Sequence, residues 1–287
     1  MKYCLLIAIA FFLLGSQSFA SEFGSECVCK KLSDDKKAIA AQIIKTQHPY
    51  DCCDKTIAEC IDEQNPCRIA VRLRNMVCRM LSKGKSVKDI ERALEKRAMS
   101  MTPSSEKIEV DLATAAFAGD KDAPVTLTLY TCVRCPYCAI LIPSLYKEVM
   151  QGSLKGKVRL VMKLFPIKGH EGSTESGITA MVAYQQNMGF EFLLYAYEHF
   201  DDFETEKMPA WAKEVGIEAG IFDKSYKDAA TRKALVDSKR EGIKNKVKAT
   251  PTLFINDRRY LAPMNIEMML DVLEEEYERR TGKERQR

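Results

Sequence analysis

The chain has 287 residues, of which 46% are hydrophobic and 29% charged, so it is long enough for two domains and has the composition of a globular protein. This composition excludes a disordered chain. The formal net charge of +4 is too small for this length to indicate nucleic-acid binding. Short basic runs, such as Arg72 with Arg74 and Arg79, are therefore interpreted as solvated helix faces.

Residues 1–20 have the pattern of a secretory signal peptide. Lys2 gives a positive start, the apolar run from Cys4 to Leu14 is too short to span a bilayer, and Ser18 to Ala20 is a small-x-small cleavage site. An uncleaved membrane anchor is the alternative. We expect cleavage after Ala20 and a soluble protein exported to the periplasm.

The cysteine count fits an oxidising compartment. Without Cys4, ten of the eleven cysteines remain, an even number. Two of them, Cys135 and Cys138, form a CxxC motif. The other eight are Cys27, Cys29, Cys52, Cys53, Cys60, Cys67, Cys78 and Cys132. Eight cysteines allow about 105 connectivities, and the sequence selects none of them.

Residues 21–101 are expected to form a cysteine-rich helical module. Amphipathic patterns predict helices over 34–45 and 66–81, and Ser86 with Asp89 starts a third helix, with its end at Ala98. Cys67 and Cys78 lie about 16 Å apart along one helix, too far for a bridge, which needs Cα atoms within about 7 Å. Each must therefore reach another segment. Thiolates that bind metal are the alternative to disulfides here.

Residues 50–98 resemble the helical domain of the CcmH family of cytochrome c maturation proteins. The similar stretches run from Cys53 to Ala58 and from Arg72 to Ile90. Tyr50 stands where that family has the first cysteine of its CxxC. The resemblance is therefore used to predict a helical, three-helix shape, and nothing about activity is inferred from it.

A polar linker is expected over 102–107, followed by a second domain over 108–287. Strands are predicted at 125–130 and 157–165, and a helix over 139–150 joins them, so they should run parallel. A helical stretch occupies about 170–241. After it we expect a strand at 251–256, a turn and a returning strand at 258–261. A helix at 265–280 closes the domain.

Strand, CxxC and helix in direct succession indicate redox chemistry at Cys135-Pro136-Tyr137-Cys138. Cys135 would lie at the helix N-terminus, where unpaired N–H groups and the helix dipole stabilise a thiolate and lower the pKa from about 8.5 to between about 3.5 and 7.5. Pro136 suits the first turn because its missing N–H is no loss there. A zinc knuckle or a structural disulfide is the alternative.

Residues 108–280 resemble the DsbA-like branch of the thioredoxin superfamily. The motifs that carry the resemblance are Gly119–Val125, Cys135–Cys138, Leu164–His170, Gly189-Phe190 and Val247–Asn256. The resemblance implies an α/β fold, a thioredoxin-like domain with an inserted helical domain, here preceded by the small all-helical module.

The resemblance also implies roles for single residues. Cys135 would be the exposed nucleophile and Cys138 the more buried thiol that resolves the mixed disulfide, with Pro136 and Tyr137 tuning thiolate stability. The Thr250–Pro251 bond would be cis, which leaves the Thr250 backbone free to bind an extended substrate strand. An ordinary proline at the start of a strand is the alternative.

Cys132 departs from the family pattern, which has a small polar residue there. It is an accessory thiol that either pairs with the helical module or competes with Cys138, and we favour the pairing. His170 is expected to cap or pack, and Trp211 to lie in the core.

The sequence therefore predicts an exported thiol–disulfide oxidoreductase that acts on protein thiols and disulfides. We expect no cofactor, no bound metal and no nucleic-acid partner. A membrane protein is expected as the redox partner. Residues 21–101 could form a homo-oligomer. Oxidase, isomerase and reductase directions stay open. The alternative is a thiol-rich protein that handles a metal such as copper.

Overall fold

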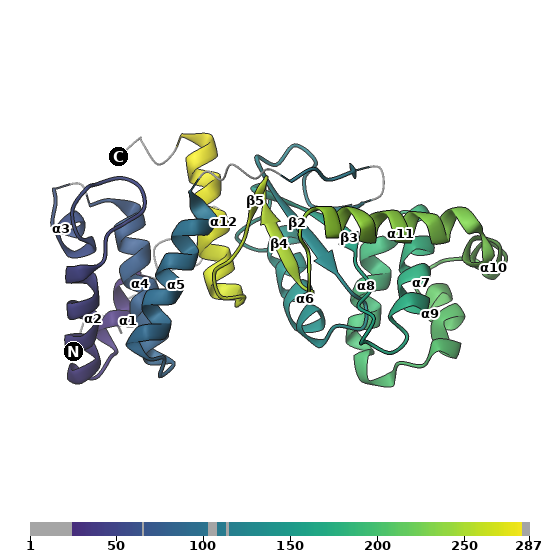
Figure 1. Ribbon diagram of the computed structural model, residues 1–287, viewed down its shortest axis with the longest axis horizontal. Coiled ribbons are helices and arrows are strands. Elements are labelled where there is room, and N and C mark those ends of the chain that lie inside the picture. The colour runs from purple at the N-terminus through teal and green to yellow at the C-terminus, as the bar shows by residue number, and fades with distance from the viewer. Residues whose placement is uncertain (1–24, 65, 103–107, 113–114, 283–287) are drawn as a thin grey trace, which may run out of the picture.

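A computed structural model of the chain describes residues 25–64, 66–102, 108–112 and 115–282, with side chains from Val28 onward. Helices lie at both ends of an elongated molecule, and a sheet lies between them (Figure 1). The expected signal peptide and most of the expected linker lie outside the described residues. None of the described helices combines the length and the hydrophobicity needed to cross a bilayer.

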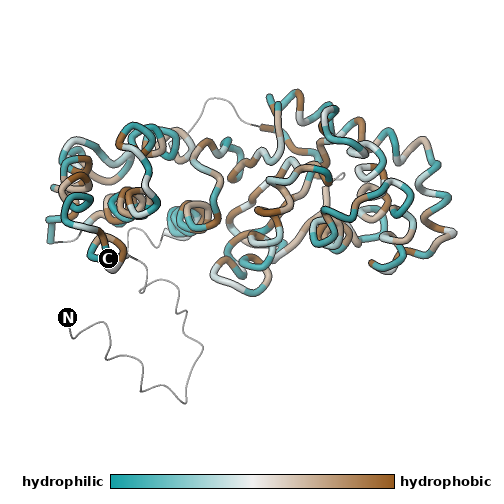
Figure 2. The backbone as a smooth tube through the Cα atoms, turned by 90° about the horizontal axis from the view of Figure 1, so that it is seen from below, coloured by the Kyte–Doolittle hydropathy of each residue, from teal (hydrophilic) through white to brown (hydrophobic). Residues whose placement is uncertain are grey.

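The N-terminal part is helical, as predicted. Its helices are α1 Ser25–Lys30, α2 Asp34–Thr46, α3 Ile57–Ile61, α4 Arg68–Ser82 and α5 Val87–Met101. Ser86 caps α5 by accepting the N–H of Asp89, as expected, and Thr56 with Glu59 caps the unpredicted α3. Hydrophilic and hydrophobic positions alternate along these helices (Figure 2), and α4 buries Leu73, Met76 and Val77.

Three disulfides link the described cysteines of this part. They are Cys29–Cys78, Cys52–Cys67 and Cys53–Cys60, each enclosing the next along the chain. Cys67 and Cys78 belong to different bridges, as helix geometry required. The side chain of Cys27 lies outside the description.

The favoured pairing of Cys132 with the module is wrong, since Cys132 is a free, buried thiol. The six described module cysteines pair with one another. Cys132 directly follows a central strand of the sheet, where the hydrophobic core encloses it.

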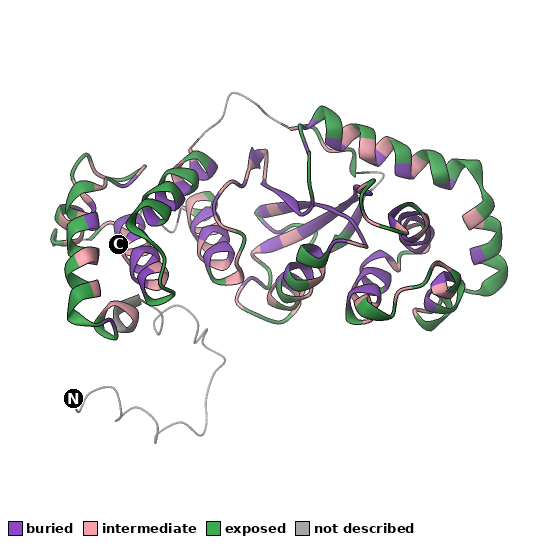
Figure 3. Ribbon diagram, turned by 60° about the horizontal axis from the view of Figure 1, so that its bottom comes forward, coloured by how far each residue is buried: buried purple, intermediate pink, exposed green. Residues whose placement is uncertain are grey.

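The central sheet has the strand order β1-β3-β2-β4-β5. The strands are β1 Ala116–Ala118, β2 Val125–Thr131, β3 Val158–Leu164, β4 Thr252–Ile255 and β5 Arg258–Arg259. β2 and β3 run parallel, as predicted, and the other pairs are antiparallel. Leu127 and Leu129 face one hydrophobic cluster and Tyr130 a second, because side chains alternate along a strand. In Figure 3 the strands are buried over most of their length.

Helices cover both faces of the sheet. α6 Pro136–Met150 and α12 Ile266–Thr281 pack on each other, and α12 also packs on β2. Between β3 and β4 the chain forms α7 Ser173–Gln185, α8 Gly189–Glu198, η2 Phe200–Asp202, η3 Thr205–Lys207, α9 Met208–Glu214, α10 Ala219–Lys227 and α11 Ala229–Lys244. These helices form the end of the molecule opposite the module (Figure 1), and Trp211 is buried among them, as predicted.

α12 joins the module to the sheet. Asp271, Glu275 and Glu278 recur on one face of α12, at spacings of four and three residues. Arg97 of α5 is fully buried and lies 2.6 Å from both Asp271 and Glu275, and Arg72 of α4 pairs with Asp271 and Glu278.

The interpretation of Arg72 and Arg79 as residues of a solvated face is therefore wrong. Arg79 also pairs with Asp271, at 3.4 Å, and its side chain is 22% exposed, while that of Arg72 is 14% exposed. The acids that bind them come from α12, almost two hundred residues later in the chain, so the charge pattern of α4 alone could not reveal them.

Candidate active site

The CxxC motif lies at the start of α6, where the sequence predicts it. β2 ends at Thr131, and a turn follows in which the N–H of Cys135 donates to the carbonyl of Cys132 at 3.0 Å. Cys135 is the N-cap and Pro136 the first helical residue. The backbone of Cys135 thus ends one turn and begins the next, which places its sulfur at the positive end of the helix.

The second motif lies against the first. The Thr250–Pro251 bond is cis, as expected, and the Cys135 sulfur lies 3.2 Å from the Thr250 carbonyl oxygen. This contact corrects one expectation, because Cys135 was expected to be exposed and is only 1% exposed. Thr250 covers it, while Tyr137 beside it is 72% exposed.

The two cysteines titrate in opposite directions. The pKa of the Cys135 thiol is lowered to about 5, first by the hydrogen bond from Cys138 and further by the backbone N–H groups of Cys138 and Tyr137. Burial, and then the neighbouring Cys135, raise the pKa of Cys138. At neutral pH the site therefore holds one thiolate, on Cys135, and one thiol, on Cys138.

A buried tyrosine of α8, Tyr197, contacts the residues that directly precede the CxxC motif. The hydroxyl groups of Tyr197 and Thr131 lie 2.7 Å apart, and Tyr197 donates to the Cys132 carbonyl at 3.3 Å. Burial raises the pKa of Tyr197, so it stays protonated. Sequence reasoning missed Tyr197, because an aromatic residue on an amphipathic helix gives no sign that it reaches a site some sixty residues earlier.

The loop before Cys135 carries two further contacts that the sequence did not reveal. The Arg134 guanidinium stacks on the rings of Phe200 and Phe203, at 4.6 and 3.9 Å from their centres, and donates to the Phe200 carbonyl at 2.9 Å. The Cys132 sulfur lies 3.5 Å from Nδ1 of His170. Both contacts tie the loop to the inserted helices and the segment that leads into them.

An apolar cavity of about 460 Å³ adjoins the motif. Its lining combines the start of α6, the cis bond and the start of α12: Tyr137, Ile140, Leu141, Ser144, Thr250, Pro251, Met264, Asn265 and Ile266. Ile140 and Met264 are 76% and 45% exposed. The cavity thus presents an apolar surface beside Thr250.

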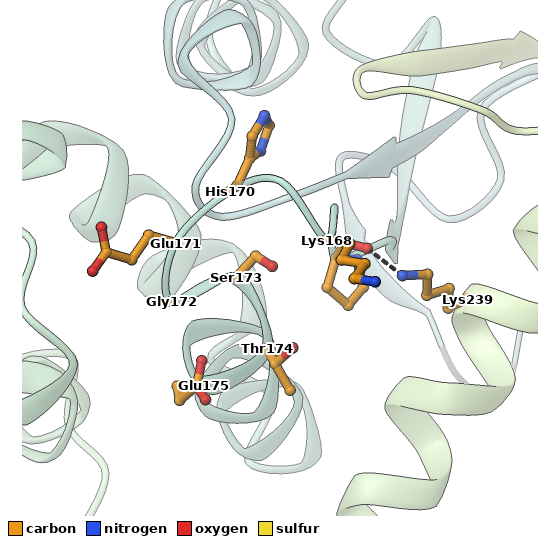
Figure 4. A pocket seen from close by; sticks show the side chains of 9 residues that line it. Lys168, His170, Glu171, Gly172, Ser173, Thr174, Glu175 and Lys239 are labelled. Carbon is orange, nitrogen blue, oxygen red and sulfur yellow. Dashed lines mark hydrogen bonds between the residues drawn. The ribbon is translucent and has the colours of Figure 1, made fainter.

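A second cavity, of about 360 Å³, lies at the start of α7 (Figure 4). Its lining is polar and includes Lys168, Glu171, Ser173 and Lys239, and Lys239 donates to the Pro166 carbonyl at 2.7 Å. The described residues contain no group of three or more His, Cys, Asp or Glu side chains placed to hold a metal ion.

Comparison with known proteins identifies the fold. Residues 111–275 match the sequence model of the family described as thioredoxin. Among solved structures, BdbD from Bacillus subtilis superimposes with a TM-score of 0.54 at 17% identity, covering 61% of this chain and all of that one. Alpha-DsbA1 from Wolbachia pipientis superimposes with a TM-score of 0.52 at 18% identity, covering 61% of this chain and 96% of that one.

The thiol-disulfide exchange protein alpha-DsbA2 from Wolbachia pipientis superimposes with a TM-score of 0.50 at 18% identity, over 64% of this chain and 97% of that one. These likenesses confirm the α/β, thioredoxin-like fold with inserted helices. The resemblance to the CcmH helical domain stays a prediction.

Curated relatives contain a similar segment in a different setting. The Na(+)/H(+) antiporter NhaA 1 of Mycobacterium sp. (strain KMS) is 24% identical over 159 residues, which make up 54% of this chain and 26% of that protein. The Na(+)/H(+) antiporter NhaA 3 of Salinispora tropica is 24% identical over 152 residues, which make up 53% of this chain and 23% of that protein. The chain thus spans about a quarter of the length of the curated relatives it matches.

Proposed function

Since the chain belongs to the thioredoxin family, we propose that it is an exported thiol–disulfide oxidoreductase that exchanges disulfides with protein substrates. One observation carries the proposal. The Cys135 sulfur, with its low pKa, lies at a helix N-terminus and within 3.2 Å of the residue that precedes a cis-proline. A reactive thiolate and a backbone able to bind substrate thus meet at one point.

Exchange would proceed through a mixed disulfide. The Cys135 thiolate attacks one sulfur of a substrate disulfide, and the other sulfur leaves as a thiolate. Cys138 then loses its proton and attacks the Cys135 sulfur, which releases the substrate thiol and forms the Cys135–Cys138 disulfide. In the reverse direction a substrate thiolate attacks Cys135 of that disulfide. Pro136 and Tyr137 would tune the thiolate through the geometry of the first turn.

Thr250 and Pro251 would hold the substrate. The Thr250 carbonyl oxygen, 3.2 Å from the Cys135 sulfur, would accept an N–H of a substrate that is bonded to Cys135. The apolar cavity beside it would accept hydrophobic side chains on either side of the substrate cysteine. Extended or unfolded protein segments are therefore the proposed substrates.

The test is a pair of single variants in exchange with a disulfide-containing model protein. Cys135→Ala should abolish exchange, and Cys138→Ala should still form mixed disulfides between Cys135 and the substrate. Full activity in Cys135→Ala would contradict the proposal.

The low Cys135 pKa favours an oxidising pair. A stable thiolate stabilises the reduced protein and makes its disulfide a stronger oxidant. Equilibration with glutathione should give a potential less negative than the value of about −270 mV typical of thioredoxin. This result would favour the oxidase or isomerase role over the reductase.

We also propose export to the periplasm and reoxidation by a membrane partner. The pattern of residues 1–20 and the disulfide-linked module support export. N-terminal sequencing of the exported protein should begin at Ser21. Sedimentation of the full chain would test the proposed homo-oligomer through residues 21–101.

Metal handling is the alternative function, and thiol titration separates the two. Six described cysteines are paired and three are free thiols, Cys132, Cys135 and Cys138. A bound copper ion held by six or more free thiols in the untreated protein would favour the alternative.

A further inference from the structure

Cys132 and Cys138 flank Cys135 at equal distances along the chain. Cys138 lies three residues after Cys135, in the first turn of α6. Cys132 lies three residues before it, across the turn closed by the 3.0 Å hydrogen bond from the Cys135 N–H to the Cys132 carbonyl. The redox cysteine thus has one cysteine neighbour on each side.

The turn brings Cys132 within bonding range of Cys135. The first and last Cα atoms of such a four-residue turn lie less than about 7 Å apart. Disulfides join Cα atoms at about 4.4 to 6.8 Å. The backbone separation is therefore compatible with a Cys132–Cys135 bridge, for which the two side chains must rotate toward each other.

Groups around Cys132 can take up its proton and stabilise its thiolate. Nδ1 of His170 lies 3.5 Å from the sulfur, and the imidazole projects away from Ser173, Thr174 and Glu175 in Figure 4. Burial raises the pKa of Cys132, while the backbone N–H groups of Ile167 and Arg134 and the Arg134 guanidinium oppose this rise.

Cys135 is the cysteine that faces the proposed substrate site. It contacts the proposed substrate-binding residue Thr250, whereas the Cys132 sulfur faces His170 and Cys138 is fully buried. Either thiol can therefore act only on a substrate that Cys135 already holds, and the two compete for the same sulfur atom.

We propose that Cys132 is a second resolving thiol of the active site. The proposal rests on the exchange function proposed above. In the mixed disulfide the Cys132 sulfur attacks the Cys135 sulfur, the bond from Cys135 to the substrate breaks, and the substrate leaves as a thiolate. The Cys132 proton passes to His170, and the product is a Cys132–Cys135 disulfide. One disulfide is broken and one formed, so no external oxidant is needed.

Attack by Cys138 on Cys135 then restores the Cys135–Cys138 disulfide and returns Cys132 to the thiol form. Cys132 thus offers a second route by which a substrate held on Cys135 is released in reduced form. This route suits an isomerase, which must let go of substrates that fail to rearrange.

The test uses Cys138→Ser protein labelled on Cys135 with thionitrobenzoate by reaction with 5,5′-dithiobis(2-nitrobenzoate). After removal of excess reagent, we expect one equivalent of thionitrobenzoate to leave at a rate independent of protein concentration. Peptide mapping should then find a Cys132–Cys135 bridge. The matched control, Cys132→Ser with Cys138→Ser, should keep its label. Cys138→Ala replaces Cys138→Ser if the serine variant does not fold.

The outcomes separate this inference from the proposed function. A label that persists equally in both variants, or a bridge from Cys135 to another cysteine, overturns the role of Cys132 and leaves exchange through Cys135 standing. Failure of Cys135 to take up the label in any variant overturns the proposed function itself. His170→Gln in the Cys138→Ser protein should slow the release, and an unchanged rate and pH profile would remove His170 from the step.

Discussion

Cys135 and Cys138 are chemically the same residue in two different environments, three positions apart. Cys135 accepts hydrogen bonds from Cys138 and from the first N–H groups of α6, whereas burial dominates at Cys138. The helix N-terminus therefore acts on one sulfur and the core on the other. This difference favours Cys135 as the nucleophile of the proposed exchange.

Alkylation by iodoacetamide should report the Cys135 thiolate. In the reduced protein we expect the rate to rise with a midpoint near pH 5 and to level off above about pH 7. Cys138→Ala should move the midpoint to higher pH, because it removes the hydrogen bond that contributes most to the low pKa. A midpoint that stays in place would mean that the helix N-terminus alone sets the pKa.

The same thiolate should make the stability of the reduced protein depend on pH. The folded-state pKa of about 5 lies below the ordinary value of 9.0, so the stabilisation is fully present above about pH 9 and is lost as the pH falls through 5. The oxidised form lacks this thiolate. The melting temperature of the reduced protein, minus that of the oxidised protein, should therefore rise from pH 5 to pH 9, and Cys135→Ser should flatten the curve.

At the scale of elements, α12 binds two parts of the molecule. Its first residues line the apolar cavity, and its acids further along bind arginines of α4 and α5. Arg97 has no exposed surface and pairs with both Asp271 and Glu275, and Asp271 also pairs with Arg72 and Arg79.

Arg97→Met should lower the free energy of unfolding by about 3 to 5 kcal/mol, because it leaves Asp271 and Glu275 buried with less compensation. The matched control is Arg68→Met, which removes a pair with Glu278 from a side chain that is 40% exposed and should cost less than about 1 kcal/mol. Urea denaturation of both variants gives the comparison. Equal losses of unfolding free energy in the two variants would show that Arg97 contributes no more than an exposed ion pair to the contact between the module and α12.

The disulfides should differ in their contribution according to the loops they close. The Cys29–Cys78 bridge spans 49 residues and the Cys53–Cys60 bridge spans 7. Each bridge restricts the unfolded chain, so replacing its two cysteines by serine should lower the free energy of unfolding. The expected loss is about 4 kcal/mol for Cys29–Cys78 and about 2.4 kcal/mol for Cys53–Cys60. Thermal unfolding of the two double variants tests the order, and a larger loss from the short loop would contradict it.

Sequence patterns gave the elements that have their own local signal. β2, α6 and the capped α5 follow from alternation, proline position and a serine cap. β1 escaped prediction because three residues, Ala-Phe-Ala, become a strand only by pairing with β3.

Within the site, the CxxC and the Thr-Pro pair were visible in the sequence, since their chemistry depends on residue type. The contacts of Arg134, His170 and Tyr197 were not, because they arise between segments that only the fold brings together. For the same reason the burial of Cys135 under Thr250 could not be foreseen.

At the scale of the whole molecule, the module and the sheet share one buried ionic contact through α12. We expect a single calorimetric unfolding transition for the intact protein, because loss of either part exposes the buried charges of the other. Arg97→Met should split this transition in two. Two transitions in the unmodified protein would show that the parts unfold independently.

The three disulfides are nested, each lying within the loop closed by the one before, and this nesting has a consequence for biosynthesis. If the chain crosses a membrane from its N-terminus, as proposed, Cys29 is the first of the six bridged cysteines to arrive and Cys52 the second, yet Cys29 pairs with Cys78, the last of the six. Oxidation in order of arrival would join the wrong partners, and all six arrive before Cys135 does. Under the proposed export, the module of a newly made molecule would therefore have to stay reduced until Cys78 arrives, or have its disulfides rearranged by a molecule that is already folded. Each generation of this protein would then depend on disulfide chemistry of the kind proposed for its own active site.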